Sequence, residues 1–97
     1  MPAYLVLTKY TDQGIHSVKD TVKRDQAARQ AIEAAGGKVI GFWSALGQYD
    51  GVVIVEVPNA ETFVQLLLAV GMQGNVRTET LQIFSEEEME RIVQRLP

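Results

Sequence analysis

The run Val-Val-Ile-Val-Glu-Val at residues 52–57 constrains the fold more than any other part of the chain, because it predicts a strand that is apolar on both faces. Successive side chains of a strand point to opposite faces of its sheet. One face of this strand therefore carries Val53, Val55 and Val57, and the other carries Val52 and Ile54. An antiparallel strand with one face in water alternates apolar and polar residues instead. We expect the sheet that contains residues 52–57 to need cover on both sides.

Residues 38–46 predict a second strand with the same property. Its side chains divide by parity into Ile40, Phe42 and Leu46 against Val39, Trp43 and Ala45. Residues 47–51 (Gly-Gln-Tyr-Asp-Gly) have the composition of a turn. The two strands are therefore expected to form a hairpin.

Two further strands and a long helix follow from residue type and periodicity. Residues 3–10 and 75–84 predict strands, and residues 11–14 (Thr-Asp-Gln-Gly) predict a turn after the first of them. Apolar and small residues at spacings of three and four predict a helix over roughly residues 17–35. Gly36-Gly37 ends this helix, because glycine accepts the left-handed conformation found at helix ends.

Two later helices have recognisable first turns. Asn59 is a suitable N-cap for a helix after the third strand, and Ser85 with Glu88 forms a capping box before the last helix. The apolar faces of these two helices are formed by Phe63, Leu66, Leu67 and Val70, and by Met89, Ile92, Val93 and Leu96. The chain thus has the element order β-α-β-β-α-β, with an additional C-terminal helix.

This order predicts an α+β fold of the ferredoxin-like, split βαβ type. Right-handed crossovers give an antiparallel sheet with the strand order 4-1-3-2, and the first two helices cover one face. At 97 residues, the chain is expected to form a single domain over residues 1–97.

The other face of the sheet is left apolar, and an exposed apolar surface of that size marks an interaction site. Either the last helix folds across it, or a second subunit covers it; because one short helix is too small to cover four strands, we predict a homo-oligomer with facing sheets.

Composition excludes several classes of partner. The net charge is −3 and basic residues are interspersed with acidic ones, so no nucleic-acid partner is expected. No apolar run approaches the roughly 20 residues that span a bilayer, so no membrane partner is expected. The N-terminus lacks the pattern of a signal peptide, and the predicted location is the cytoplasm. Absence of cysteine excludes thiol catalysis, disulfides and thiolate metal sites.

The predicted topology brings three polar, glycine-containing segments to one end of the sheet: residues 11–14, 47–51 and 74–77. Polar groups that converge beside an apolar wall are typical of a small-molecule site. The candidate ligand-binding residues are Asp12, Gln13, Gly47, Tyr49, Asp50, Asn75 and Arg77. The alternative is purely structural: glycine, asparagine and aspartate are common in turns, and Arg77 would then pair with Asp12 or Asp50 to fix the loops.

Catalytic candidates are few. His16 is the only histidine, a residue type that commonly carries protons, so it is a candidate proton carrier, together with Tyr49 and Asp50. No metal site is predicted, because no cluster of ligating residues surrounds His16. No cofactor is predicted either, since the chain has no glycine-rich phosphate loop. The chain also lacks the nucleophile elbow of α/β-hydrolases.

The motif Gly47-x-Tyr49-Asp50, followed by residues 52–56, resembles the signature of the GYD-domain family. Residues 4–15 and 74–78 are also similar to that family, so the resemblance covers essentially the whole chain. It implies a ferredoxin-like fold and a cytoplasmic location, and it implies no particular reaction. The residues that carry it belong to the same three segments that the topology brings together.

Two functions of different classes follow, with a purely structural oligomer as the third. The first is a small-molecule-binding or regulatory module, with Arg77 as the counter-charge for an anion. The second is a cofactor-free enzyme similar to dimeric α/β-barrel monooxygenases, with His16, Tyr49 and Asp50 as acid–base groups. An apolar cavity of about 300 Å³ or more, into which His16 or Asp50 opens, would favour the enzyme, whereas a solidly filled space between helices and sheet would exclude it.

Overall fold

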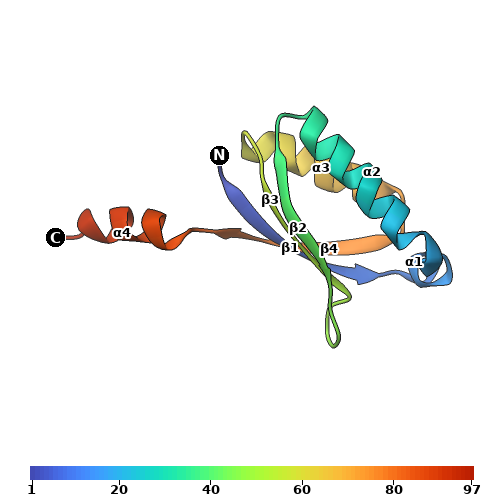
Figure 1. Ribbon diagram of the computed structural model, residues 1–97. Helices are drawn as coiled ribbons and strands as arrows, with labels where there is room; N and C mark the ends of the chain where they lie inside the picture. Colours follow the sequence, from blue (N-terminus) through green and yellow to red (C-terminus); the bar gives the residue numbers. More distant parts are fainter.

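The computed structural model describes residues 1–97 and contains one four-stranded sheet with the order β2-β3-β1-β4 (Figure 1). The strands are β1 (Ala3–Tyr10), β2 (Lys38–Ser44), β3 (Gly51–Glu56) and β4 (Val76–Ile83). All three neighbouring pairs are antiparallel. The predicted ferredoxin-like α+β fold and its strand order are confirmed.

The two long helices lie together on one face of this sheet (Figure 1). The helical elements are α1 (Asp12–His16), the 3-10 turn η1 (Val18–Asp20), α2 (Thr21–Ala34), α3 (Ala60–Met72) and α4 (Glu86–Gln94). A membrane-crossing segment is absent among them, since none is both long and apolar enough. The Asn59 side chain accepts from the Thr62 N–H at 2.9 Å, and Ser85 and Glu88 form the predicted capping box.

The segment after β1 differs from the prediction of a turn and one continuous helix. Thr11 caps the short helix α1, because its hydroxyl accepts from the Gly14 N–H at 3.0 Å. A Cβ on Gly14 would lie 1.8 Å from the carbonyl oxygen of Asn75, so only glycine fits there. Ser17 then leaves the helical conformation, and the long helix begins at Thr21 rather than near residue 17.

A β-bulge in β2 changes the predicted parity of its side chains. The pairing with β3 shifts between Val39 and Gly41, which leaves Ile40 without a partner. Val39 and Phe42 therefore both face the helices, although the sequence pattern placed them on opposite sides. Trp43 faces the other side and lies over Gly41, whose Cβ position would be 2.8 Å from the indole ring.

The two faces of the sheet differ sharply in cover. On the helix side, which we call the covered face, Val57 is 0% exposed and Phe63 of α3 is 4% exposed. The Phe63 ring stacks on Tyr4 with 4.8 Å between centroids. The opposite side, which we call the open face, bears the apolar residues Leu5, Leu7, Trp43, Val52, Ile54, Leu81 and Ile83. Nothing in the chain covers it, and Leu81 is 56% exposed.

Helix α4 does not cover the open face. It continues outward from the end of β4 and stands clear of the sheet (Figure 1). The molecule is consequently elongated, 52 × 31 × 18 Å, with a radius of gyration of 14.7 Å, against about 12.5 Å for a compact chain of this length. Its accessible surface is 6985 Å², against about 5,500 Å² for a typical folded chain of this mass.

Candidate functional site

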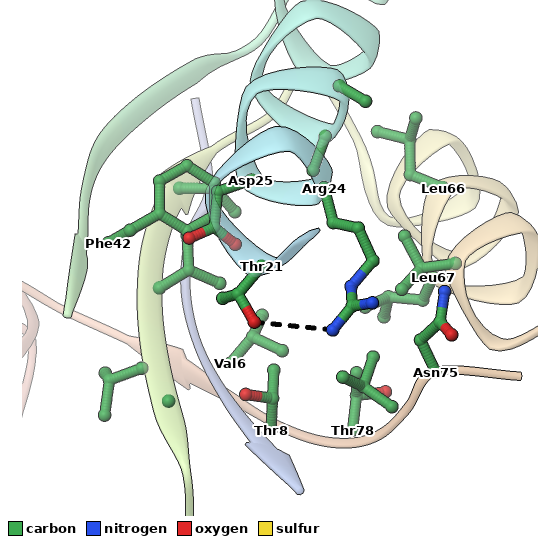
Figure 2. A pocket seen from close by; sticks show the side chains of 18 of the residues that line it. Val6, Thr8, Thr21, Arg24, Asp25, Phe42, Leu66, Leu67, Asn75 and Thr78 are labelled. Atoms are coloured by element: carbon green, nitrogen blue, oxygen red, sulfur yellow. Dashed lines mark hydrogen bonds between the residues drawn. The ribbon is translucent and has the colours of Figure 1, made fainter. Parts of the chain in front are cut away.

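The main cavity lies between the two long helices and the covered face, and it has a volume of about 220 Å³ (Figure 2). Its walls are largely apolar. They are formed by Val6, Val53 and Val55 of the sheet and by Leu66, Leu67 and Val70 of α3. On the α2 side, the wall includes the small side chains of Ala27, Ala28 and Ala31. A cavity of roughly 150 Å³ accommodates benzene, so this one suits a somewhat larger ring or a branched aliphatic group.

Polar groups collect where β1 leads into its loop. The Tyr10 hydroxyl and Thr21 Oγ1 lie 3.2 Å apart, and both residues line the cavity. Asp50 accepts from the Tyr10 N–H at 2.8 Å, which fixes the β2–β3 turn against β1. Thr8 and Thr78 extend from neighbouring strands into the same region (Figure 2).

Arg24 extends from α2 into this polar region, toward Thr78 and Asn75 (Figure 2). Its Nη1 donates to the Ser17 carbonyl at 3.1 Å and to Ser17 Oγ at 3.0 Å. Its Nη2 donates to the Gly14 carbonyl at 3.3 Å and to Thr21 Oγ1 at 3.4 Å. All four acceptors are neutral, so the guanidinium joins α1 to α2 with no carboxylate among its hydrogen-bond partners.

Asp25 also lines the cavity and lies beside Phe42 (Figure 2). Partial burial raises the pKa of this carboxyl above its ordinary value, and the nearby charges of Arg24 and Arg29 oppose the shift. The cavity wall therefore carries one cationic residue, Arg24, and two acidic ones, Asp25 and Asp50, in largely apolar surroundings. Such a chamber with few polar groups can hold a small organic molecule and orient it.

Two of the three predicted segments are in direct contact. Gln13 Nε2 donates to Asn75 Oδ1 at 3.0 Å and to the Gln73 carbonyl at 2.8 Å. The Thr11 N–H donates to the Asn75 carbonyl at 3.1 Å. Asp12 lies in the first turn of α1 and is exposed. The loop after β1 and the loop before β4 thus form one end of the molecule, as the topology predicted.

The third segment divides between the two faces. Asp50 lines the cavity, whereas Tyr49 belongs to a shallow depression of the open face with Lys9 and Arg77. The Tyr49 hydroxyl donates to Glu79 at 2.6 Å, and this hydrogen bond raises the Tyr49 pKa. Arg77 and Asp50 therefore lie on opposite sides of the sheet, and the structure does not bring them together as a pair.

The remaining candidates lie outside the cavity. Gly47 is exposed in the hairpin turn at a positive φ of 127°, a conformation that favours glycine. His16 is exposed at the end of α1. Of the three catalytic candidates His16, Tyr49 and Asp50, only Asp50 opens into the cavity. The cavity, at about 220 Å³, is smaller than the volume that would favour the enzyme hypothesis, although the space between helices and sheet is not solidly filled.

Two of the three charged residues of the cavity wall, Arg24 and Asp25, were not predicted from the sequence. A signal was present in the spacing: Thr21, Arg24 and Ala28 fall at i, i+3 and i+7, on the stripe of α2 that faces the sheet. Thr8 has the parity of the buried Val6 on β1, which places a hydroxyl on the covered face. In both elements, a polar residue at a position that faces the apolar core was the signal that could have indicated these side chains.

Comparison with known proteins gives a curated relative that matches most of the chain. It is a Thermus thermophilus protein described as a glutamine synthetase and cystathionine beta-lyase binding protein. The two sequences are 32% identical over 83 residues, which covers 84% of this chain and 87% of the relative.

Solved structures share the fold. The Mycobacterium tuberculosis leucine response regulatory protein LrpA is 21% identical with a TM-score of 0.56, over 87% of this chain. The present chain spans about half of LrpA, 51% of its length. The protein TTHA0845 of Thermus thermophilus is 26% identical with a TM-score of 0.54, over 88% of this chain and 95% of the other. The similarity to LrpA shows only that the two proteins share a fold.

A family model that matches nearly the whole chain identifies the family. The model of the GYD domain matches residues 4–93, which include the covered face, the cavity and most of α4. Together with the 32% identical relative, this match confirms the resemblance carried by Gly47, Tyr49 and Asp50. The chain therefore belongs to the GYD-domain family.

Proposed function

We propose that this protein is a regulatory binding module that holds a small organic molecule between its helices and its sheet and works as a homo-oligomer. The observation that carries the proposal is the apolar cavity of about 220 Å³ with a few polar groups at one end. Its ligand has a ring or branched aliphatic body between α2 and α3. The polar end of the ligand lies near Asp50 and Asn75, two of the residues singled out in the sequence.

A binding role agrees with the description of the Thermus relative, which is named for the enzymes it binds. By this analogy, the partner of the present chain is a metabolic enzyme, and the small molecule modulates that association. Catalysis is less well supported, because His16 and Tyr49 lie away from the cavity. Binding of purified glutamine synthetase or cystathionine beta-lyase, measured by calorimetry with and without the small molecule, tests the enzyme partner directly.

Ligand binding is tested by thermal unfolding with three probes of different chemistry: indole, benzoate and isovalerate. A probe present at about ten times its Kd stabilises the folded protein by about 1.4 kcal/mol, which raises Tm by several degrees. The variant Ala28→Phe fills the cavity from α2 and is expected to lose this increase. Ala34→Phe makes the same change on the exposed end of α2, outside the cavity, and should keep it.

If none of the three probes raises Tm, the proposed ligand class is wrong. An increase that persists in Ala28→Phe shows that the molecule binds elsewhere, and it also contradicts the proposal. The two phenylalanine variants should unfold cooperatively without ligand, as checked by circular dichroism.

Self-association is supported by the open face. The face is apolar along its centre, and the accessible surface of 6985 Å² exceeds the roughly 5,500 Å² typical of a folded chain of this mass. Sedimentation of the wild-type chain at micromolar concentration should give a dimer or larger species. A stable monomer at that concentration contradicts the homo-oligomer and leaves the cavity proposal to be judged by the ligand experiment.

A further inference from the structure

Residues 85–97, which we call the arm, form the most isolated part of the molecule. The arm contains α4, whose Ser85 cap and first-turn glutamates make its beginning well defined. Its apolar stripe consists of Met89, Ile92, Val93 and Leu96, and Leu96 is 66% exposed. Figure 1 shows the arm extending past the end of the sheet, with no other element beside it. An amphipathic helix is stabilised mainly by packing its apolar face, so this stripe needs a partner.

The arm is directed away from its own open face. Only Phe84 and Ser85 separate β4 from α4, and Ser85 has the extended backbone angles φ −68° and ψ 165°. The chain consequently leaves the sheet without reversing its direction, and α4 lies beyond the strand ends (Figure 1). Two apolar surfaces of one chain, the arm stripe and the open face, are thus both uncovered and spatially separate.

We propose that the arm docks on the open face of a second copy of this chain, so that two copies exchange their arms. The inference rests on the self-association proposed above and identifies the segment that secures it. A two-fold dimer makes both contacts at once, because each copy offers one arm and one open face.

The surface area fits this occupant. The accessible surface of 6985 Å² exceeds the value expected for a compact chain by more than the roughly 800 Å² that each partner contributes to a standard interface. The excess arises from the elongated shape, with a radius of gyration of 14.7 Å, and the arm is its main cause. Docking the arm on a second copy removes this excess without any third molecule.

The dimensions fit as well. Helix α4 has 9 residues and is about 13 Å long and about 10 Å wide. Strands are spaced by about 4.8 Å, so one such helix covers about two of the four strands. The other two strands remain available for direct contact between the sheets, which agrees with the facing arrangement expected from the sequence.

The charges are complementary. The arm carries four glutamates and two arginines. The open face and its ends carry three basic residues, Lys9, Lys38 and Arg77, against the two acids Glu56 and Glu79. Glu79 is already engaged by the Tyr49 hydroxyl. An acidic arm on a weakly basic face favours docking and orients it.

The first test places a charge on each side of α4. Val93 belongs to the apolar stripe and Gln94 to the opposite side, so Val93→Glu and Gln94→Glu make the same change on two faces. We expect Val93→Glu to raise the dimer dissociation constant at least about thirtyfold, the effect of losing a central interface residue. Gln94→Glu should change it less than about threefold, as at an exposed rim. Sedimentation equilibrium measures both constants.

The second test uses the absence of cysteine from the chain. A Val93→Cys protein is mixed with a Leu81→Cys or Leu5→Cys protein of different mass, and mild oxidation is followed by denaturing electrophoresis. Arm exchange predicts a mixed disulfide between the two chains. A Val22→Cys protein, altered on the outer side of α2, serves as the control that should not cross-link with Val93→Cys.

The outcomes separate this inference from the self-association on which it rests. If Val93→Glu leaves the dimer intact while Leu81→Glu on the open face dissociates it, arm exchange is wrong and the sheet interface stands. If the wild-type chain is a monomer, both proposals fail. A Val93→Cys/Leu81→Cys double variant that forms its disulfide only within one chain shows the arm folded on its own sheet, and that result overturns arm exchange.

Discussion

Both faces of the sheet carry a band of large apolar residues, but the surroundings of the two bands are very different. Val55 of β3 and Val57, directly after the strand, belong to the covered face and are 1% and 0% exposed. Their neighbours Val52 and Ile54 face the other way and are only partly buried, by the side chains beside them. The covered face is closed by α2 and α3, whereas the open face is closed by nothing in this chain (Figure 1).

This difference shows that alternation alone does not reveal which face of a strand is the core. An apolar face becomes a core only where another element packs on it, because burial rather than residue type provides the stabilisation. An apolar face that lacks such cover is a surface for association. Replacing residues on the two faces should therefore affect different properties, stability on one and assembly on the other.

The largest expected effect is at Phe63, on the covered side. Phe63→Ala removes a ring that is 4% exposed and stacked on Tyr4, and it should lower the free energy of unfolding by about 3–5 kcal/mol. Leu81→Ala on the open face should lower it by less than about 1 kcal/mol, because that side chain is already exposed to water. Urea unfolding at sub-micromolar concentration measures both. Equal losses would mean that the two faces are equally buried in the monomer.

Glycines on the two faces give a sharper comparison. On the covered side, a Cβ on Gly51 would lie 2.7 Å from Oγ1 of Thr8, a short side chain that has little room to move away. Gly51→Ala should lower the free energy of unfolding by about 1–3 kcal/mol through overpacking. Gly41→Ala contacts the outer ring atoms of Trp43 on the open side, and an exposed indole can move away. Its effect should be smaller, and a larger loss than at Gly51 would contradict the description of the open face.

The arm provides the next test, because its helix depends on local interactions. Ser85→Ala removes the hydroxyl that accepts from the Glu88 N–H at 3.1 Å, and it should destabilise α4 by about 1 kcal/mol. Helicity should fall with little change in the urea midpoint of the sheet. The matched variant Ser44→Ala, an exposed serine outside any helix, should leave helicity unchanged.

The same helix end has a defined pH dependence. The Ser85 N–H donates a hydrogen bond to the Glu88 carboxylate, and this bond lowers the pKa of Glu88. The stabilising effect is therefore present above the unfolded pKa of glutamate and lost as the pH falls through the lower folded value. Helicity of α4 should decrease in acid, and this decrease should be weaker in Glu88→Gln. An equal decrease in both proteins would assign the acid response to other groups.

The smallest expected effect is at Asp25, in the cavity wall. Burial raises its pKa more than Arg24 and Arg29 lower it. Burial favours the protonated form of the Asp25 carboxyl. The contribution of Asp25 to stability is therefore present below the pKa of aspartate in the unfolded chain and lost as the pH rises through its pKa in the folded protein. Asp25→Asn should raise Tm slightly at pH 7, and the gain should disappear near pH 3. A lower Tm at pH 7 would show that the arginines outweigh burial.

Local signals allowed much of the fold to be predicted from the sequence. The bounds of β1 and the caps at Asn59 and Ser85 depend on neighbouring residues only, and the structure confirms them. Helix α1 was predicted only as a turn, because its five residues are too few to show apolar periodicity. The bulge at Ile40 was also missed, since a one-residue register shift leaves no mark on the apolar pattern.

The candidate site was predictable only in part. The predicted topology put Gln13, Asn75 and Asp50 at one end of the sheet. In the structure, Gln13 bonds to Asn75 and Asp50 lines the cavity. The topology could not separate Tyr49 from Asp50, because adjacent residues of a turn go to different faces according to backbone angles that the sequence does not specify. Arg24 was overlooked because a charged residue of a helix is ordinarily solvent-exposed.

The position of Trp43 has a practical consequence. It is the only tryptophan of the chain, and it lies on the open face with 51% of its surface exposed. Fluorescence emission from this indole reports on that face alone, without a label. A blue shift with increasing protein concentration would follow association as it occurs.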